Sequence, residues 1–460
     1  MTTGRKLFLA LILLDVLSVI AVFNILSILR GVGTSEHVII FPLVAPILAL
    51  VFALYLIDGY SSRADMISLD YTSLHTIALV NSLIATLLMT YVIMPSGFEL
   101  QSSRIVIALS YIVLVPLTLS YRRLVYQRSS YIRGTRSLVF LGDAASSRAF
   151  QQECARLGST QPVIYSIVTS PSHVPWKLDE PSQLQLRPFA DVLEEIQQDR
   201  LMVEAIILRE SSPELPEDIS QTLVELYFGG VPTYTLELFH QVYWRKIPLY
   251  RLNQTWLFQE GFQIAREPVF ERLKRAGDIA FALLGLIVTA PVILLGGFLA
   301  WLEDRGPFFF AQNRVGKNHA PFRLYKLRSM RSSPGEGDLY TRSDDERITR
   351  VGRLLRAARI DEFPQLWNVL RGDMSLIGPR AEWDRLVAKY EREIPCYHFR
   401  HLVKPGITGW AQVNYPYGEN LDDTLRKLEY DLYYIRHFSF VLDASIVLKT
   451  IHVMLFGKGR

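Results

Sequence analysis

The sequence has few cysteines, and this scarcity narrows what the protein can be. Only Cys154 and Cys396 occur among 460 residues, far apart and in no Cys-x-x-Cys or mixed Cys/His spacing. A disulfide framework or a structural zinc site at such spacings is therefore not expected, and a reducing location suits the soluble parts. The formal net charge is only +4, and we expect no nucleic-acid partner.

Hydrophobic residues, by contrast, are abundant and gather in long runs. They make up 50% of the chain, and the mean hydropathy is +0.18. The first four runs lie at 7–29, 38–58, 74–94 and 104–121. Each is close to the roughly 20 residues that cross the hydrocarbon core of a bilayer. The sequence therefore predicts a four-helix transmembrane domain over residues 1–125.

The charges around these runs predict an orientation. Lysines and arginines precede the first run and follow the fourth, whereas the loops 30–37 and 95–103 carry little positive charge. The positive-inside rule then places both ends of the domain in the cytoplasm. Asp15 lies inside the first run, and we expect it to have a structural partner in the bundle, such as Asn81 or a backbone group.

Residues 136–260 show a different pattern, in which short apolar strands alternate with helix-like segments. The predicted strands are 137–141, 162–168, 204–208 and 231–236, and the predicted helices are 146–157, 190–199 and 214–228. This alternation is typical of a small parallel sheet. The first turn, GDAASS at 142–147, has one glycine where a dinucleotide fingerprint needs three. We therefore predict a degenerate Rossmann-like domain used for regulation or assembly, with nucleotide binding as the less favoured alternative.

A fifth apolar run, Ile279–Leu302, is predicted to enter the membrane and return. Basic residues flank it on both sides, so the charge rule favours both ends in the cytoplasm. Pro291 lies near its middle, where it removes a helical hydrogen-bond donor and crowds the preceding turn. We predict a re-entrant helix at 278–303, and the alternative is an ordinary span with a proline kink.

The strongest chemical signal lies between Arg347 and Arg380. The adjacent acids Asp361 and Glu362 follow arginines at every third position, 347, 350, 353, 356 and 359. Carboxylates beside guanidinium groups suit chemistry on a phosphorylated substrate, because the cations neutralise phosphate oxygens that would repel an attacking anion. The alternative is a basic amphipathic helix that ends at a capping aspartate, with Pro364 opening the next helix.

Ordered motifs surround this segment. They are Lys274-Arg275, Gly306-Pro307, FRLYKLRSM at 322–330, ARIDEFPQLWNVLRGDMSLIGPR at 358–380, KPGITGWAQVN at 404–414 and LEYDLYYIRHFSFVLDASIVLKT at 428–450. Through them the stretch 274–460 resembles the bacterial sugar transferases, which act as polyprenyl-phosphate glycosyl-1-phosphate transferases. Two departures are visible. Ala381 replaces the family's usual proline, and His319-Ala320 replaces its usual small-basic pair.

The resemblance implies a mostly α-helical catalytic domain over 270–460, and with charge chemistry it suggests residue roles. Asp361 is the predicted nucleophile and Glu362 the predicted Mg²⁺ ligand, with the opposite order within the pair left open. The predicted phosphate and substrate contacts are Lys326, Arg328, Arg359, Arg380 and Gln412. The arginine helix and the apolar tail after Phe438 are predicted to be interfacial amphipathic helices.

The domain contains several other polar features. We interpret Asp373 as a turn residue, and His398 and His401 as surface or packing residues. The polar loop 331–345 is a candidate lid or an ordinary solvated loop. Residues 415–418, with sequence YPYG, are a candidate specificity segment.

Together these features predict an enzyme of the bacterial inner membrane with its catalytic domain on the cytoplasmic face. The resemblance implies transfer of a sugar-1-phosphate from a UDP-sugar to polyprenyl (undecaprenyl) phosphate, which releases UMP and begins exopolysaccharide, capsule or O-antigen synthesis. We expect a homodimer in contact with the lipid bilayer. The alternative functions are a non-catalytic assembly or regulatory protein of polysaccharide export and, less favoured, a nucleotide-sugar oxidoreductase.

Overall fold

The chain divides into two compact units, Met1–Tyr243 and Trp244–Arg460. The computed structural model describes residues 2–31, 41–57, 59–60, 66–93, 104–133, 136–159, 161–167, 184–198, 200–209, 215–249, 268–331, 347–415 and 420–456. Within these residues the protein is mostly helical, with four helices long and apolar enough to cross a membrane and a five-stranded parallel sheet.

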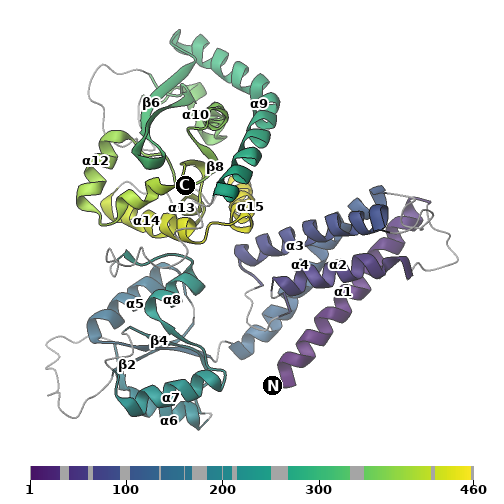
Figure 1. Ribbon diagram of the computed structural model, residues 1–460, viewed down its shortest axis with the longest axis vertical. Coiled ribbons are helices and arrows are strands. Elements are labelled where there is room, and N and C mark those ends of the chain that lie inside the picture. The colour runs from purple at the N-terminus through teal and green to yellow at the C-terminus, as the bar shows by residue number, and fades with distance from the viewer. Residues whose placement is uncertain are drawn as a thin grey trace. The chain divides into compact units, whose positions relative to one another are not determined.

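Four helices pack together in the first unit (Figure 1). They are α1 (Thr2–Leu29), α2 (Val44–Leu56), α3 (Leu69–Leu88) and α4 (Arg104–Arg133). Helix α1 packs on α4, and α3 packs on both α2 and α4. Apolar and tyrosine side chains fill their shared core, while many other leucines, isoleucines and valines face outward. Such outward apolar surface marks contact with lipid or another apolar partner.

The second predicted run forms a shorter helix than the sequence suggested. The three long candidates in this unit are Phe8–Leu29, Tyr71–Val92 and Arg104–Gln127. Helix α2 has only 13 residues and follows a single 3-10 turn, Phe41–Leu43. At 1.5 Å per residue it is roughly 20 Å long, which is less than the roughly 30 Å hydrocarbon core. Residues 32–40, where the run begins, lie outside the described part.

Asp15 has a structural partner within the bundle, as expected, although the partner is not Asn81. The Arg122 guanidinium from α4 donates two hydrogen bonds to the Asp15 carboxylate, at 2.7 and 2.6 Å. Tyr60 donates a third, at 2.7 Å, and Tyr121 also contacts the carboxylate. Both charged side chains are fully buried. In the sequence, Arg122 is one of the basic residues that follow the fourth apolar run. In the structure it is the counter-ion of Asp15 inside the bundle.

The second part of the first unit confirms the predicted parallel sheet. Its strands are β1 (Ser137–Leu141), β2 (Val163–Ile167), β3 (Leu186–Pro188), β4 (Val203–Leu208) and β5 (Thr233–Thr235). They are arranged in the order β3-β2-β1-β4-β5, which is the order of a doubly wound fold. Figure 1 shows helices α5 (Ala144–Arg156) and α8 (Leu236–Phe239) on one face and helices α6 (Phe189–Gln197) and α7 (Glu217–Phe228) on the other.

The turn after β1 carries an acid where a dinucleotide-binding fold would place a phosphate. Asp143 is the N-cap of α5 and accepts a hydrogen bond from the Ser146 backbone N–H at 2.7 Å. Its carboxylate also forms an ion pair with Arg209. The positive end of the helix is therefore already bound to an anion of the chain itself.

The second unit combines one long helix with short strands and helices. Its first part contains α9 (Pro268–Asp304), the antiparallel hairpin of β6 (Phe309–Val315) and β7 (Pro321–Leu327) around the turn η9 (Lys317–His319), α10 (Arg350–Ala357), η10 (Ile360–Glu362) and α11 (Gln365–Arg371). Its second part contains β8 (Ser375–Ile377), α12 (Asp384–Glu393), η11 (Tyr397–Leu402), β9 (Gly406–Thr408), α13 (Trp410–Asn414), α14 (Leu421–Arg436) and α15 (Phe440–Phe456).

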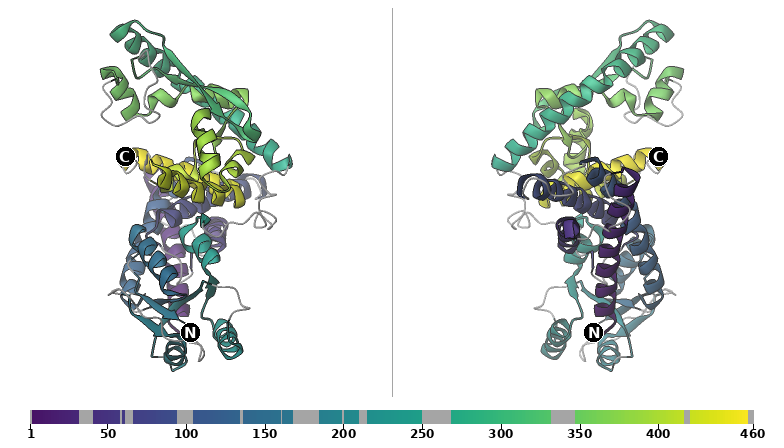
Figure 2. Two further views of the ribbon diagram at one scale, coloured as in Figure 1. Left: turned by 90° about the vertical axis from the view of Figure 1, so that its left-hand side faces the viewer. Right: turned by 90° about the vertical axis from the view of Figure 1, so that its right-hand side faces the viewer.

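Helix α9 runs along one side of the second unit (Figures 1 and 2). It is continuous over 37 residues and contains Pro291, and its ribbon changes direction partway along in Figure 1. Near its start, Asp278 accepts hydrogen bonds from Ser375 and the Leu376 backbone. At its end, Glu303 accepts from the Arg350 backbone N–H at 2.8 Å. Both ends of this apolar helix are therefore bound to the same folded unit.

Helices α9 and α15 turn their polar side chains inward and their apolar side chains outward. In α15, Asp443 pairs with Lys274 at 2.5 Å, and buried Lys449 donates to Asn414 at 2.8 Å. Large apolar side chains of the two helices are about half exposed or more, among them Ile287, Val288, Leu294, Val441 and Ile451. A surface helix of a soluble protein does the opposite: its apolar side chains face the core and its polar side chains face water.

Candidate functional site

The acid pair lies in the single 3-10 turn η10, between α10 and α11. Arg359, in the left-handed region at φ 53°, turns the chain away from α10. Helix α11 begins at Gln365 and has no side-chain hydrogen bond at its N-cap, Pro364. Asp361 is therefore not the capping residue that the alternative interpretation of this segment required.

Three cations from separate segments lie around Glu362. Lys326 Nζ, near the end of β7, donates a hydrogen bond of 3.1 Å to Glu362 Oε1. Arg380 Nη2 lies 3.6 Å from the same oxygen, and Arg359 Nη1 lies 3.9 Å from Oε2. The Glu362 side chain is only 13% exposed, so these charges interact more strongly than they would at a solvated surface.

Asp361 differs from its neighbour in its hydrogen bonding. It is 8% exposed, and among the described residues no other side chain hydrogen-bonds or ion-pairs with its carboxylate. Burial raises the pKa of Asp361; the charge of Lys326 opposes this shift, and the charge of Glu362 adds to it. Its own backbone N–H also acts on the carboxylate and lowers the pKa, so among the described residues the Asp361 oxygens have no side-chain donor, although cations lie nearby.

The same surroundings act in the opposite direction on Glu362. Burial alone would raise the pKa of Glu362, but Lys326, Arg380 and Arg359 outweigh burial and hold that pKa at about 2. Burial also lowers the pKa of the Lys326 ammonium, against the attraction of Glu362. Two adjacent carboxyl groups whose pKa values move apart are suited to different tasks.

Backbone packing between two motifs positions Arg380. The Gly378 N–H donates to Thr408 O at 2.9 Å, and the Gly406 N–H donates to Pro379 O at 2.9 Å. A Cβ atom on Gly406 would lie 2.1 Å from the Gly378 nitrogen, so a side chain there would force the strands apart. The predicted Gly-Pro-Arg turn and the KPGITGW run are therefore one structural unit.

Lys326 and Arg380 also line a small cleft. The cleft is bounded by Arg314, Leu324, Lys326, Gln365, Met374, Arg380, Ala381 and Gly406. Sequence reasoning missed Arg314 and Gln365, which come from β6 and the first turn of α11 and had no distinctive spacing. Ala381, one of the two departures from the family pattern, is buried beside Arg380.

The structure does not bring every predicted substrate contact to the acid pair. Arg328 is buried and pairs with Asp304 at the end of α9. Its guanidinium also donates to Ala300 O at 3.1 Å. Gln412 donates to Ile407 O at 3.1 Å within its own turn and does not line the cleft. The geometry therefore does not support a substrate contact by Arg328 or Gln412.

Other predicted features are placed as follows. Asp373 lies just after α11, 3.6 Å from the Arg371 side chain and 3.2 Å from the Asn368 amide, as suits a turn residue. His401 is buried rather than at the surface. Most of the loop 331–345 and residues 416–418 of the YPYG segment lie outside the described residues.

The acid pair is chemically suited to Mg²⁺. Carboxylate oxygens are hard ligands, and Mg²⁺ commonly binds through one or two carboxylates plus substrate phosphates. Asp361 supplies oxygens with no side-chain donor among the described residues, and ionised Glu362 supplies negative charge beside them. The cations now around Glu362 would have to move onto phosphate for its oxygens to become available.

The fold and the site together define a class. Long apolar helices make this a membrane protein, and the buried acid pair has three cations within 3.9 Å of Glu362. The model of the bacterial sugar transferase family matches residues 269–457, which include every element of that site. A Rhizobium leguminosarum exopolysaccharide production protein, PSS, is 42% identical over 195 residues, which cover 41% of this chain and 98% of the relative. The chain therefore belongs to the bacterial sugar transferase family.

Two further relatives have names that state an activity. A UDP-N-acetylgalactosamine-undecaprenyl-phosphate N-acetylgalactosaminephosphotransferase of Aeromonas hydrophila is 39% identical over 257 residues. That match covers 56% of this chain but only 60% of the relative. A UDP-glucose:undecaprenyl-phosphate glucose-1-phosphate transferase of Caulobacter vibrioides is 42% identical over 185 residues, covering 40% of this chain and 69% of the relative.

Proposed function

We propose that this protein transfers a sugar-1-phosphate from a UDP-sugar to polyprenyl (undecaprenyl) phosphate, releases UMP and so begins exopolysaccharide, capsule or O-antigen synthesis. One observation carries the proposal. The Asp361 carboxylate has no side-chain donor among the described residues, yet it lies beside a carboxylate surrounded by three cations. The family membership and the printed names of the relatives support the same substrates.

In the proposed first step, an Asp361 carboxylate oxygen attacks the sugar-bearing phosphorus of the UDP-sugar. The bond between that phosphorus and the bridging oxygen breaks, and UMP leaves with the bonding electrons. In the second step, a phosphate oxygen of the polyprenyl carrier attacks the same phosphorus and frees the Asp361 carboxylate. A covalent intermediate lets one site serve a soluble donor and a lipid acceptor in turn.

The cations explain how one cleft accepts a diphosphate. Lys326, Arg359 and Arg380 neutralise Glu362 while no substrate is bound, and phosphate oxygens are better partners for guanidinium forks than a single carboxylate. We propose that they move onto the donor phosphates and release Glu362 to hold Mg²⁺. When bound, Mg²⁺ neutralises the diphosphate and stabilises charge on the leaving group.

Replacement of each acid separates the two roles. Purified protein in nanodiscs with Mg²⁺, polyprenyl phosphate and a panel of UDP-sugars should release UMP with at least one donor. Asp361→Asn should abolish release and any phospho-sugar adduct on the protein, detected by mass spectrometry. Glu362→Gln should slow adduct formation but respond to a higher Mg²⁺ concentration. If Asp361→Asn still formed the adduct, the nucleophile assignment would be wrong.

We further propose that α9 is a re-entrant membrane helix with Pro291 at its bend. Both ends of α9 bind the same folded unit, through Asp278 at one end and Glu303 at the other. A helix that crossed the bilayer would place those ends on opposite sides, and the polar unit that binds both of them would then have to lie across the hydrocarbon core, where unpaired polar groups are costly. The outward apolar surface of α9 and α15 supports insertion of this face into one leaflet.

Two engineered cysteines test this topology. Arg272→Cys and Asn313→Cys place thiols at exposed positions before and after the proposed re-entrant segment 278–303. A membrane-impermeant maleimide should label both from the cytoplasmic side, in inverted vesicles and not in intact cells. A full span would give labelling from opposite sides. The two native thiols require the unsubstituted protein as the background control.

The remaining proposals concern domain organisation, membrane location and assembly. We propose domains at 1–125, 136–260 and 270–460, with the first forming a four-helix transmembrane domain and the last lying on the cytoplasmic face of the bacterial inner membrane. Because Asp143 occupies the helix end where a phosphate would bind, we propose that the sheet domain serves regulation or assembly, in a homodimer. Nucleotide titration and size analysis in detergent test these two points.

A further inference from the structure

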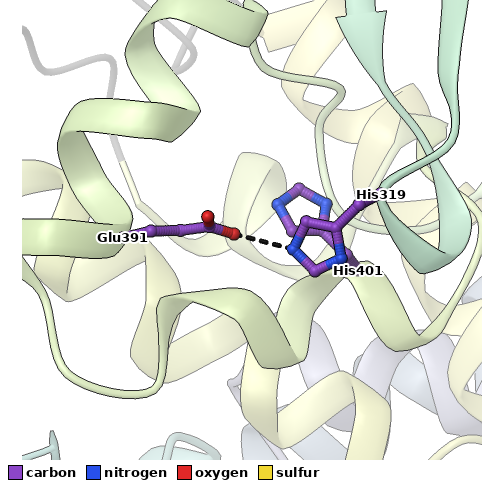
Figure 3. Close-up of side chains that lie close together, drawn as sticks. All are labelled: His319, Glu391 and His401. Carbon is purple, nitrogen blue, oxygen red and sulfur yellow. Dashed lines mark hydrogen bonds and ion pairs between the residues drawn. The ribbon is translucent and has the colours of Figure 1, made fainter.

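A second cluster of candidate ligands lies apart from the acid pair. Figure 3 shows His319, Glu391 and His401 side by side. Their candidate ligand atoms all lie within 4.8 Å of one another. They come from the hairpin turn η9, from helix α12 and from the 3-10 helix η11. None of the three has a role in the proposed transfer.

His401 is the unusual member of the cluster. It is 6% exposed, and its Nε2 is buried without a hydrogen-bond partner among the described residues. A buried polar atom without a partner costs free energy, on the order of 1–3 kcal/mol, and most such atoms in folded proteins are satisfied. The His401 Nε2 atom is therefore available to bind a metal ion.

The other two members of the cluster, His319 and Glu391, are in direct contact. His319 Nε2 lies 2.7 Å from Glu391 Oε1, and the His319 and His401 rings have centroids 4.7 Å apart. His319 has a left-handed backbone, at φ 61°, which brings its side chain from the hairpin turn towards α12. Two imidazoles and one carboxylate thus converge from segments that are distant in the sequence.

We propose that His319, Glu391 and His401 form a binding site for a divalent transition-metal ion, with zinc as the favoured occupant. Two imidazole nitrogens and one carboxylate oxygen are a common zinc ligand set that leaves a fourth position open to water. Magnesium and calcium prefer all-oxygen sites and suit this set poorly. The site is separate from the Mg²⁺ proposed at the acid pair and does not depend on it.

The geometry is close to what zinc requires. Ligands about 2.0–2.2 Å from a tetrahedral ion lie about 3.3–3.6 Å from one another. The His319–Glu391 contact of 2.7 Å would open by about 0.6–0.9 Å to reach this separation, and the remaining atoms would close from a separation of at most 4.8 Å. Two of the three side chains are exposed, so rotamer adjustment can supply these shifts.

The charges in the region are compatible with a dication. Glu391, the one acid of the cluster, supplies negative charge beside the two imidazoles. Arg400, the adjacent cation, is already paired with Asp431 at 3.0 Å and donates to Arg380 O at 2.9 Å.

A bound ion would tie the hairpin turn to two elements of the catalytic unit. The site would join η9, α12 and η11, and η11 also holds the backbone of Arg380 through Arg400. We therefore assign the ion a structural role, which stabilises the frame around the acid pair without entering the reaction. Its loss should lower the thermal stability of this unit.

The test uses the full chain in detergent, freed of metal by chelation and kept in excess Mg²⁺ so that oxygen sites are filled. Zinc titration should give one ion per chain with a rise in Tm, and Co²⁺ should give the visible absorption bands of a tetrahedral site. His319→Asn, which tolerates the left-handed backbone, and Glu391→Gln should each weaken zinc binding by at least about 100-fold, since even an outer-shell partner costs 10–100-fold.

Matched variants separate this site from unspecific binding. His398→Asn removes a neighbouring exposed histidine and Glu393→Gln an exposed acid at the end of the same helix. Cys396→Ser removes the only cysteine of the second unit. All three should bind zinc like the parent protein. Equal binding by His319→Asn and the parent, or no stoichiometric binding by the parent, would overturn the proposal, and neither result bears on UMP release.

Discussion

Replacement of Lys326 by methionine tests the electrostatic basis of the site. The substitution keeps an unbranched side chain of similar length but removes the charge 3.1 Å from Glu362. Coulomb's law gives about 1.3 kcal/mol for such a pair in water and about 5 kcal/mol at an effective dielectric constant of 20. The Lys326 and Glu362 side chains are 20% and 13% exposed, so the interaction lies between these limits.

The expected kinetic effect of Lys326→Met comes from the contact that Lys326 is proposed to make with the substrate. The same ammonium is proposed to contact donor phosphate, and a hydrogen bond to a charged group contributes about 1.5–3 kcal/mol. A loss of about 1.5–3 kcal/mol of transition-state stabilisation lowers kcat/KM roughly 13- to 160-fold. UMP release measured at saturating Mg²⁺ checks this value, and Lys326→Arg should retain most of the activity.

The pH profile provides a second measurement. Glu362 has a pKa of about 2 because three cations oppose the effect of burial. A depressed pKa means that the ionised acid is favoured above that pH and is lost only in strong acid. Removal of Lys326 raises this pKa, so the acid limb of UMP release should move to higher pH in Lys326→Met.

A matched substitution on the same strand decides between site electrostatics and a general charge effect. Arg323 is exposed and lies three residues before Lys326, on the opposite face of β7. Arg323→Met should leave both kcat/KM and the acid limb close to those of the parent. If Lys326→Met behaved like Arg323→Met, the assignment of Lys326 to the phosphate site would be refuted.

Two further predictions concern stability. Asp15→Asn should destabilise the bundle by about 3–5 kcal/mol, because it leaves buried Arg122 without its counter-ion, and the loss should appear as a lower Tm and reduced membrane yield. Gly352→Ala should destabilise the catalytic unit strongly, because its Cβ would lie 2.0 Å from Ser329 O, whereas Gly277→Ala meets no atom within 4 Å and should be neutral or stabilising by up to about 1 kcal/mol. A Gly352→Ala protein with the Tm of Gly277→Ala would contradict the packing shown.

Local patterns in the sequence predicted much of the fold. The apolar runs for α1, α3, α4 and α9 were evident because lipid-facing helices need long uncharged segments. The strand–helix alternation gave the parallel sheet. Strand β3 was missed because it has only three residues, Leu186–Pro188, and ends in a proline. The length of α2 was overestimated because hydropathy does not report where a helix begins.

The candidate site was predicted in part. The sequence indicated Asp361 and Glu362, and the structure brings Lys326, Arg359 and Arg380 to Glu362. Motif membership alone did not distinguish these cations from Arg328, whose partner Asp304 becomes its neighbour only when α9 folds back along the hairpin. Side-chain direction at the end of a strand depends on such long-range packing.

The cluster of His319, Glu391 and His401 could not be predicted from the sequence, because it too depends on long-range packing. His319 and Glu391 are 72 residues apart, and neither has metal-ligand spacing with His401 in the sequence. Ligands that come from three separate elements leave no periodic pattern along the chain. Their convergence depends on how the hairpin turn folds onto α12 and η11.

The paired glycines Gly378 and Gly406 have a consequence for how this domain varies. Their backbone contacts close a loop, because the chain between them begins and ends at the same place in the fold. That chain also fills much of the core of this unit, where Leu386, Tyr390 and Tyr397 are buried, and its Arg400 donates a hydrogen bond to Arg380 O. Exposed positions of the segment, such as Glu391, can therefore vary while Arg380 keeps its place, whereas its buried positions cannot.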